Sequence, residues 1–65
     1  MTNAEAIIRL QAKLRYTQKL IEVELGDERK NFWRQQDIAA FELAVAALEY
    51  LHNVQEYEAS QVPIA

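Results

Sequence analysis

Residues 37–57, DIAAFELAVAALEYLHNVQEY, constrain the fold most because they form a long, largely apolar stretch without Gly or Pro. At about 100° per residue this stretch fits a helix with its glutamates on one narrow strip, namely Glu42, Glu49 and Glu56, with Asn53 beside them. Nearly all of the remaining circumference is apolar. A surface helix normally hides one apolar stripe, so this helix is expected to pack against more than one neighbour.

The length of the chain favours self-association. A chain of 65 residues makes a single domain, and below roughly 70–80 residues one core rarely supplies more than a few kcal/mol. Cysteine is absent, which excludes disulfides and thiolate metal sites. Association between copies remains as the means of stabilising so small a domain.

The distribution of charge suggests two elements that pack together. The formal net charge is −3, which gives no reason to expect nucleic acid or an anionic membrane. Residues 1–33 carry six basic and five acidic side chains, whereas residues 34–65 carry one basic and five acidic. No segment approaches the roughly 18–20 apolar residues of a membrane span, and Glu5 and Arg9 interrupt the apolar core that a signal peptide needs. The sequence therefore predicts a soluble, cytoplasmic protein with no membrane partner.

The first 25 residues predict one amphipathic helix. Thr2 followed by Glu5 fits a capping box, so the helix should begin near Asn3. Gly26 is the only glycine and stands where a left-handed C-cap is expected. The predicted helix is 3–25, and its apolar stripe, with Thr17 and Gln18 as the weak point, consists of Ile7, Leu10, Leu14, Ile21 and Leu25.

The second half predicts a connector, a helix and a tail. The connector, 26–36, is polar except for Phe32 and Trp33; these aromatics either cap the open end of the core or form an exposed anchor for a partner. Asp37 suits an N-cap, which predicts a helix 37–58, although the apolar phase allows a start as early as 31. The tail, 59–65, is expected to be flexible, with docking on a neighbour as the alternative.

Two helices of similar length and a short connector predict an all-α, antiparallel two-helix hairpin. When the two helices of one hairpin pack together, apolar side chains on their other faces stay exposed. A large exposed apolar patch marks an interface. We expect two hairpins to dimerise into a four-helix bundle, with higher order open, through Leu43, Ala47, Tyr50, Val54, Tyr57, Ile8, Tyr16 and Leu20. Setting Leu25 opposite Asp37 would bring Lys13 level with Glu49, and Lys19 near Glu42.

The sequence predicts neither an enzyme nor a cofactor site. Glu49 and His52 form an E-x-x-H pair like that of di-iron bundles, but residues 10–13 at the same level of the first helix include no carboxylate. A lone His52 gives no catalytic triad. A single glycine gives no phosphate-binding loop.

An RNA- or DNA-binding helical dimer is the alternative function. Arg9, Lys13, Arg15 and Lys19 form two basic edges on the first helix with Tyr16 between them, and helical dimers can bind RNA through such a face. Small plasmid proteins that promote pairing of copy-control RNAs are similar to this chain in architecture only. These cations are instead expected to pair with Glu5, Glu22 and the acidic second helix.

Two short segments resemble a family of small helical-hairpin proteins encoded by phages and prophages of Gram-positive hosts. The first is Glu5-Ala6-Ile7 with Leu10, and the second runs from Asp37-Ile38 through Ala40 and 42–45 to 47–49. The long basic first helix and the Phe32-Trp33 pair depart from the family pattern. The family has no shared activity, so no residue role is transferred. The resemblance implies a phage accessory protein, in the host cytoplasm, that binds a larger protein as yet unidentified. Independently of the resemblance, the aromatic residues Phe32 and Trp33 are candidate contacts for such a partner.

Overall fold

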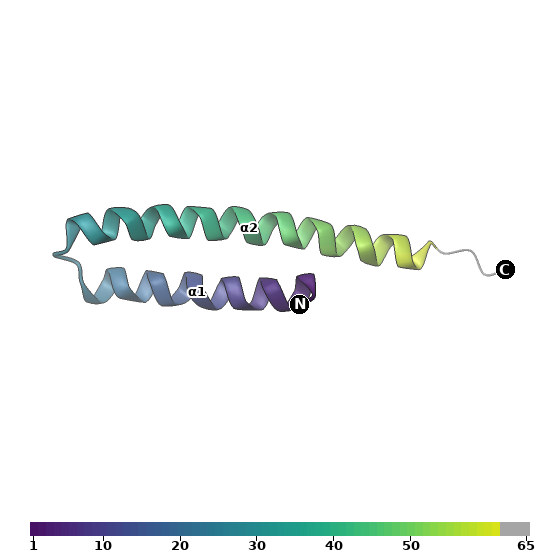
Figure 1. The fold of residues 1–65 in the computed structure, drawn as a ribbon, viewed down its shortest axis with the longest axis horizontal. Helices are drawn as coiled ribbons and strands as arrows, with labels where there is room; N and C mark the ends of the chain where they lie inside the picture. Colours follow the sequence, from purple (N-terminus) through teal and green to yellow (C-terminus); the bar gives the residue numbers. More distant parts are fainter. Residues whose placement is uncertain (62–65) are drawn as a thin grey trace.

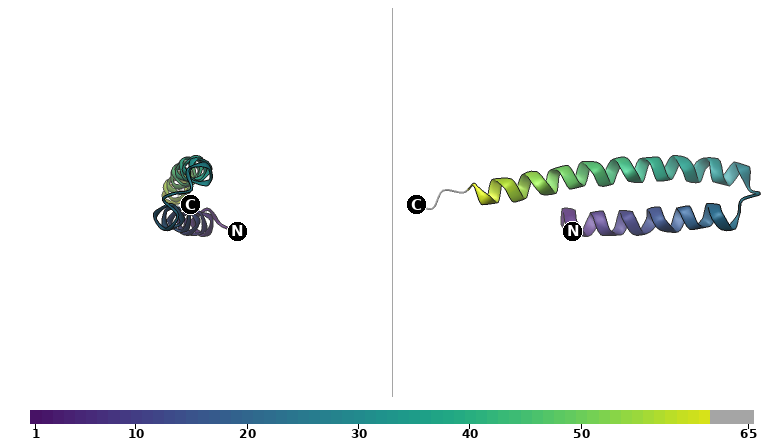
Figure 2. Two further views of the ribbon diagram at one scale, coloured as in Figure 1. Left: turned by 90° about the vertical axis from the view of Figure 1, so that its left-hand side faces the viewer. Right: turned by 180° about the vertical axis from the view of Figure 1, so that it is seen from behind.

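The computed structural model describes residues 1–61, which form two helices joined by a tight turn (Figure 1). Helix α1 is Asn3–Val23 and helix α2 is Glu28–Ser60. The helices lie side by side and run antiparallel, and the end-on view shows no third element over the outer side of either (Figure 2). The predicted all-α hairpin is confirmed.

Local capping explains where each helix begins. The Thr2 hydroxyl oxygen accepts a hydrogen bond from the Glu5 N–H at 3.1 Å, so the predicted N-cap of the first helix is confirmed. Asp27 caps α2 in the same way and accepts from the Lys30 N–H at 3.1 Å. A cap of this kind satisfies one of the backbone N–H groups that a helix start leaves without a partner.

The predicted connector, 26–36, is wrong because α2 begins at Glu28, within the first turn after Gly26. The predicted helix end at Leu25 is also wrong, since α1 ends at Val23 and Glu24 is its C-cap. Gly26 does not adopt a left-handed conformation. The reason is that the Asp27 N–H donates to the Glu24 carbonyl at 3.0 Å, which closes the turn without a left-handed residue.

The two helices differ in length, contrary to expectation. At about 1.5 Å per residue, α1 is about 32 Å long and α2 is about 50 Å long, so α2 continues past the N-terminal end of α1 (Figure 1). Ala59 and Ser60 complete the last turn of α2, which corrects the start of the predicted tail. The flexibility expected of the rest of the tail, and the alternative in which Val62 and Ile64 dock on a neighbour, concern residues 62–65, which lie outside the described residues.

The helices meet along a heptad seam, which we call the hairpin seam. Its residues alternate in steps of three and four, the spacing of coiled coils, and all are half-buried except the buried Asn31. The seam consists of Asn3, Ile7, Leu10, Leu14, Thr17, Ile21 and Glu24 on α1, and of Asn31, Arg34, Ile38, Phe41, Val45, Leu48 and His52 on α2.

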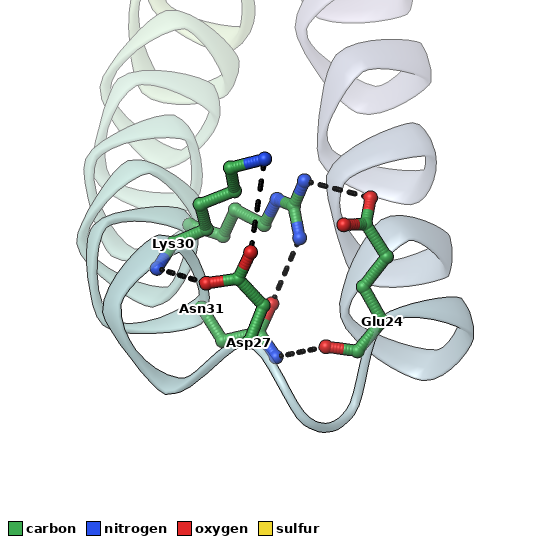
Figure 3. A network of polar contacts seen from close by, with 5 residues as sticks. Glu24, Asp27, Lys30 and Asn31 are labelled. Atoms are coloured by element: carbon green, nitrogen blue, oxygen red, sulfur yellow. Dashed lines mark hydrogen bonds and ion pairs between the residues drawn. The ribbon is translucent and has the colours of Figure 1, made fainter.

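A polar clamp at the turn sets the register of the two helices (Figure 3). The Asn31 amide donates to the Glu24 carbonyl at 2.8 Å, and its oxygen accepts from the Arg34 guanidinium at 3.0 Å. Arg34 also pairs with the Glu24 carboxylate at 3.1 Å. Because Asn31 lies against Glu24, steps of seven away from the turn bring Thr17 level with Ile38, and finally Asn3 level with His52.

The hairpin has no enclosed core of its own. Among residues 1–61 no apolar residue is fully buried, and Asn31, at 8% exposure, is the only buried residue. The chain exposes 5458 Å², whereas a compact monomer of its 7.5 kDa would expose about 4,200 Å². The difference is about 1,200 Å², and both helices keep large hydrophobic side chains exposed.

Candidate protein-interaction surface

The outward face of α2 lies opposite the hairpin seam and carries no charge from residue 32 to residue 57. It comprises the three heptad positions farthest from the seam. In order, these are Phe32, Trp33, Gln36, Ala39, Ala40, Leu43, Ala46, Ala47, Tyr50, Asn53, Val54 and Tyr57. Apart from the half-buried Val54, every one of these side chains is exposed. We call this surface the outward face.

The large side chains of the outward face are mostly in water. Leu43 is 74% exposed, Tyr50 69% and Tyr57 66%. A continuous apolar surface along a helix of this length exceeds the scattered hydrophobic residues that a monomer normally shows. The face therefore has the composition of an interface between helices.

A second heptad series runs along the outward face. Starting at Trp33, steps of three and four pass through Gln36, Ala40, Leu43, Ala47, Tyr50 and Val54 to Tyr57. The same spacing forms the hairpin seam on the other side of α2, and this repeat lets one helix pack lengthwise against another. All five α2 residues predicted for self-association belong to this series, so they are adjacent on one face.

Phe32 and Trp33 lie in the first turns of α2 and not in a connector. Their rings meet edge to face at a centroid separation of 5.3 Å, and they are 55% and 62% exposed. The polar clamp closes the turn beside them, and Phe32 lines a hollow with Ile21 and Leu25. The pair extends the outward face toward the turn.

The three α1 residues predicted for self-association do not join this face. Ile8 and Tyr16 are 64% and 65% exposed and lie on α1, away from the hairpin seam. Leu20 is half-buried at the edge of the seam. Whether the two surfaces meet in an assembly stays a prediction.

The basic residues of α1 are exposed, and Lys13 and Lys19 make no ion pair within the described part of a single hairpin. The clamp sets a register one heptad away from the expected one, so Lys13 is level with Glu42 instead of Glu49. Arg15 lines a shallow hollow together with Glu42 and Glu49. Within residues 1–61 the ion pairs involve Lys30, Arg34 and His52 only.

The E-x-x-H pair is split between two environments. His52 belongs to the hairpin seam and its Nε2 lies 3.8 Å from the Glu56 carboxylate, whereas Glu49 is exposed at the edge. No three His, Asp or Glu side chains in the described part of the chain are close enough together to hold a metal ion.

Sequence reasoning missed Glu24, Asn31 and Arg34, the residues that fix the register. Their polar side chains hid the seam positions, because apolar periodicity counts only hydrophobic residues. The three- and four-residue spacing from Asn31 through Arg34 and Ile38 to Phe41 could have revealed them.

Neither helix contains an apolar stretch that could cross a membrane.

Comparison with known proteins found no relative of this chain. No protein-family model matches the sequence, and no curated protein or solved structure matches the chain either.

Proposed function

We propose that this protein is a self-associating helical interaction module in which the outward face of α2 packs against a second copy of the chain. The observation that carries the proposal is the uncharged, exposed heptad series on the side of α2 opposite the hairpin seam. A helix with apolar series on two sides is stable in water when both are covered. The first helix covers one of them, and the second copy covers the other.

The available area suits a dimer. Aromatic side chains bury about 150–250 Å² each, and the four on the outward face keep more than half of their surface exposed. Together with Leu43 they offer on the order of 600 Å² of apolar area. The alanines and Val54 bring the face close to the roughly 800 Å² that each partner contributes to a standard interface.

The biological role that we propose is that of a small phage or prophage accessory protein, which occupies or inhibits a site on a larger protein. The support for this role is the resemblance of residues 5–10 and 37–49 to the phage hairpin family. Phe32 and Trp33 are candidate contacts for the larger protein, because exposed tryptophan is a frequent anchor of protein interfaces.

Nucleic-acid binding is the second candidate function, favoured by one observation. Arg9, Lys13, Arg15 and Lys19 are all exposed, and none makes an ion pair in the described part of the chain. Binding through these cations would weaken steeply as salt is raised, because each phosphate contact releases counterions. A titration with RNA and duplex DNA at low salt that detects no binding removes this candidate.

Fluorescence of Trp33, the only tryptophan, tests the proposed self-association. Its side chain is mostly exposed in a single hairpin, so covering the outward face should shift its emission to shorter wavelengths as the protein concentration rises. Leu43→Glu places a charge in the middle of the face and should abolish the shift. Gln18→Glu adds the same charge on the exposed surface of α1 and should preserve it.

Two results would refute the proposed self-association. One is a wild-type emission maximum that stays unchanged from nanomolar to high micromolar concentration. The other is an equal shift in Leu43→Glu and wild type, which would assign the change to some other surface.

A further inference from the structure

We propose that the two copies pair through α2 in antiparallel orientation, with the two-fold axis at the level of residue 45. This inference rests on the proposed self-association and specifies its geometry. In this arrangement the two α2 helices are the inner pair of four, and each α1 lies on the outer side of its own α2. The inference follows from the sizes and charges of the outward-face residues.

Side-chain size selects the antiparallel orientation. The heptad series along the face alternates small and large residues between Ala40 and Tyr50. With the axis at residue 45, Leu43 of one copy faces Ala47 of the other, and Tyr50 faces Ala40. When a large residue of one helix faces a small residue of the other, the side chains of the two helices interdigitate along their contact. Parallel pairing would instead set Tyr50 against Tyr50 and Ala47 against Ala47, which leaves crowded layers beside empty ones.

The ends of the series support the same register. Val54 then faces Gln36, and Tyr57 faces Trp33, so the whole series from residue 33 to residue 57 is covered. Sliding the second α2 by one heptad toward the turn would place Trp33 against Tyr50 and Val54 against the charged Arg29, and would leave Tyr57 beyond the start of the other α2. Only the central register uses every large residue of the face.

Charge disfavours the opposite shift. In the proposed register, Lys30 of one copy lies level with Glu58 of the other, beside the interface between the two α2 helices. The two-fold axis repeats this pair at the other end of the interface. Both side chains are exposed, so the pair adds little stability, but it favours the register. A shift of one heptad away from the turn would place Asp37 level with Glu58, two like charges.

The same arrangement explains why the central part of α2 carries charged side chains along one narrow strip only. Glu42, Glu49 and Glu56 are exposed and lie at neither the hairpin seam nor the outward face. They therefore stay in water when both apolar sides of α2 are covered. An inner helix needs such a strip for its charged side chains, because burying an unpaired carboxylate is costly.

Cysteine cross-linking tests the register, and the chain has no native cysteine. Ala39, Ala46 and Asn53 lie seven residues apart on one flank of the proposed interface and are exposed. The proposed register places Ala46 beside its own counterpart and Ala39 beside Asn53 of the other copy. A short bismaleimide should therefore link Ala46→Cys to itself, and should link Ala39→Cys to Asn53→Cys only when the two variants are mixed.

Each alternative gives a different pattern and would overturn the inference. In a parallel pair equivalent flank residues lie on opposite sides of the interface, so none of the three variants should link to itself or to another although the protein is a dimer. A shift toward the turn links Ala39→Cys to Ala46→Cys, and a shift away from it links Ala46→Cys to Asn53→Cys. Gln18→Cys, on the exposed surface of α1, serves as the control that should not form a linked dimer.

Light scattering on the same cysteine variants separates failure of the register from failure of self-association. Dimers with any other cross-linking pattern overturn the register and leave the proposed module intact. Monomers without cross-links overturn both.

Discussion

At the scale of single residues, Asn31 controls how the helices align. Its amide group bonds both the Glu24 carbonyl and the Arg34 guanidinium, and it is the only buried residue among residues 1–61. A buried asparagine in a heptad seam typically fixes register at some cost in stability. Here it also gives the Glu24 carbonyl at the end of α1 a second hydrogen bond, beside the one from the Asp27 N–H.

Replacing Asn31 with Ala should lower the free energy of unfolding by about 1–3 kcal/mol, because it removes the hydrogen bonds that Asn31 makes to the Glu24 carbonyl and to Arg34. Urea unfolding followed by circular dichroism at one fixed protein concentration measures the change. Gln18→Ala removes an exposed amide from α1 and should change the stability much less. Equal stability of the Asn31 variant and wild type would mean that the clamp does not hold the turn.

At the scale of the elements, the sequence predicted the helices better than the turn between them. Thr2 as the cap of α1 is confirmed, and Ile7, Leu10, Leu14 and Ile21 of the predicted apolar stripe lie in the hairpin seam. The prediction of Leu25 as the last residue of that stripe was wrong, because it lies past the end of α1 and is 73% exposed. The start of α2 was missed because 27–36 is polar and resembles a loop by composition. That segment is helical because Asp27 caps it and because Asn31 and Arg34 face the seam.

The candidate surface was predictable in its middle and not at its end. The apolar stripe Leu43, Ala47 and Tyr50 follows from helical periodicity alone. Its extension to Phe32 and Trp33 requires knowing that α2 starts at Glu28. The register of the hairpin could not be predicted either, because it depends on where the turn closes and on hydrogen bonds between polar side chains.

The turn itself supplies a prediction that distinguishes the observed conformation from the expected one. Gly26 has no left-handed backbone, and a Cβ placed on it would meet no atom within 4 Å. Gly26→Ala should therefore raise the free energy of unfolding by about 0.4–1 kcal/mol, by reducing the freedom of the unfolded chain. Thermal unfolding at matched concentration measures this. A left-handed Gly26 would give the opposite sign, since alanine is strained there.

At the scale of the whole molecule, α2 is a helix with two apolar sides and one charged strip. The hairpin seam covers the first side, and the outward face remains open in a single chain. Because no apolar residue in the described part of the chain is fully buried, a second copy would supply much of the missing burial. Stability that depends on a partner rises with protein concentration, so unfolding experiments on this protein need a stated concentration.

The molar mass in solution tests this account most directly. Light scattering across micromolar concentrations should give about twice the chain mass of 7.5 kDa for wild type if the outward face packs against a second copy, as we propose. Leu43→Glu should give the mass of one chain under the same conditions, and Gln18→Glu should match wild type. A wild-type protein that remains at the mass of one chain at every concentration would contradict the account.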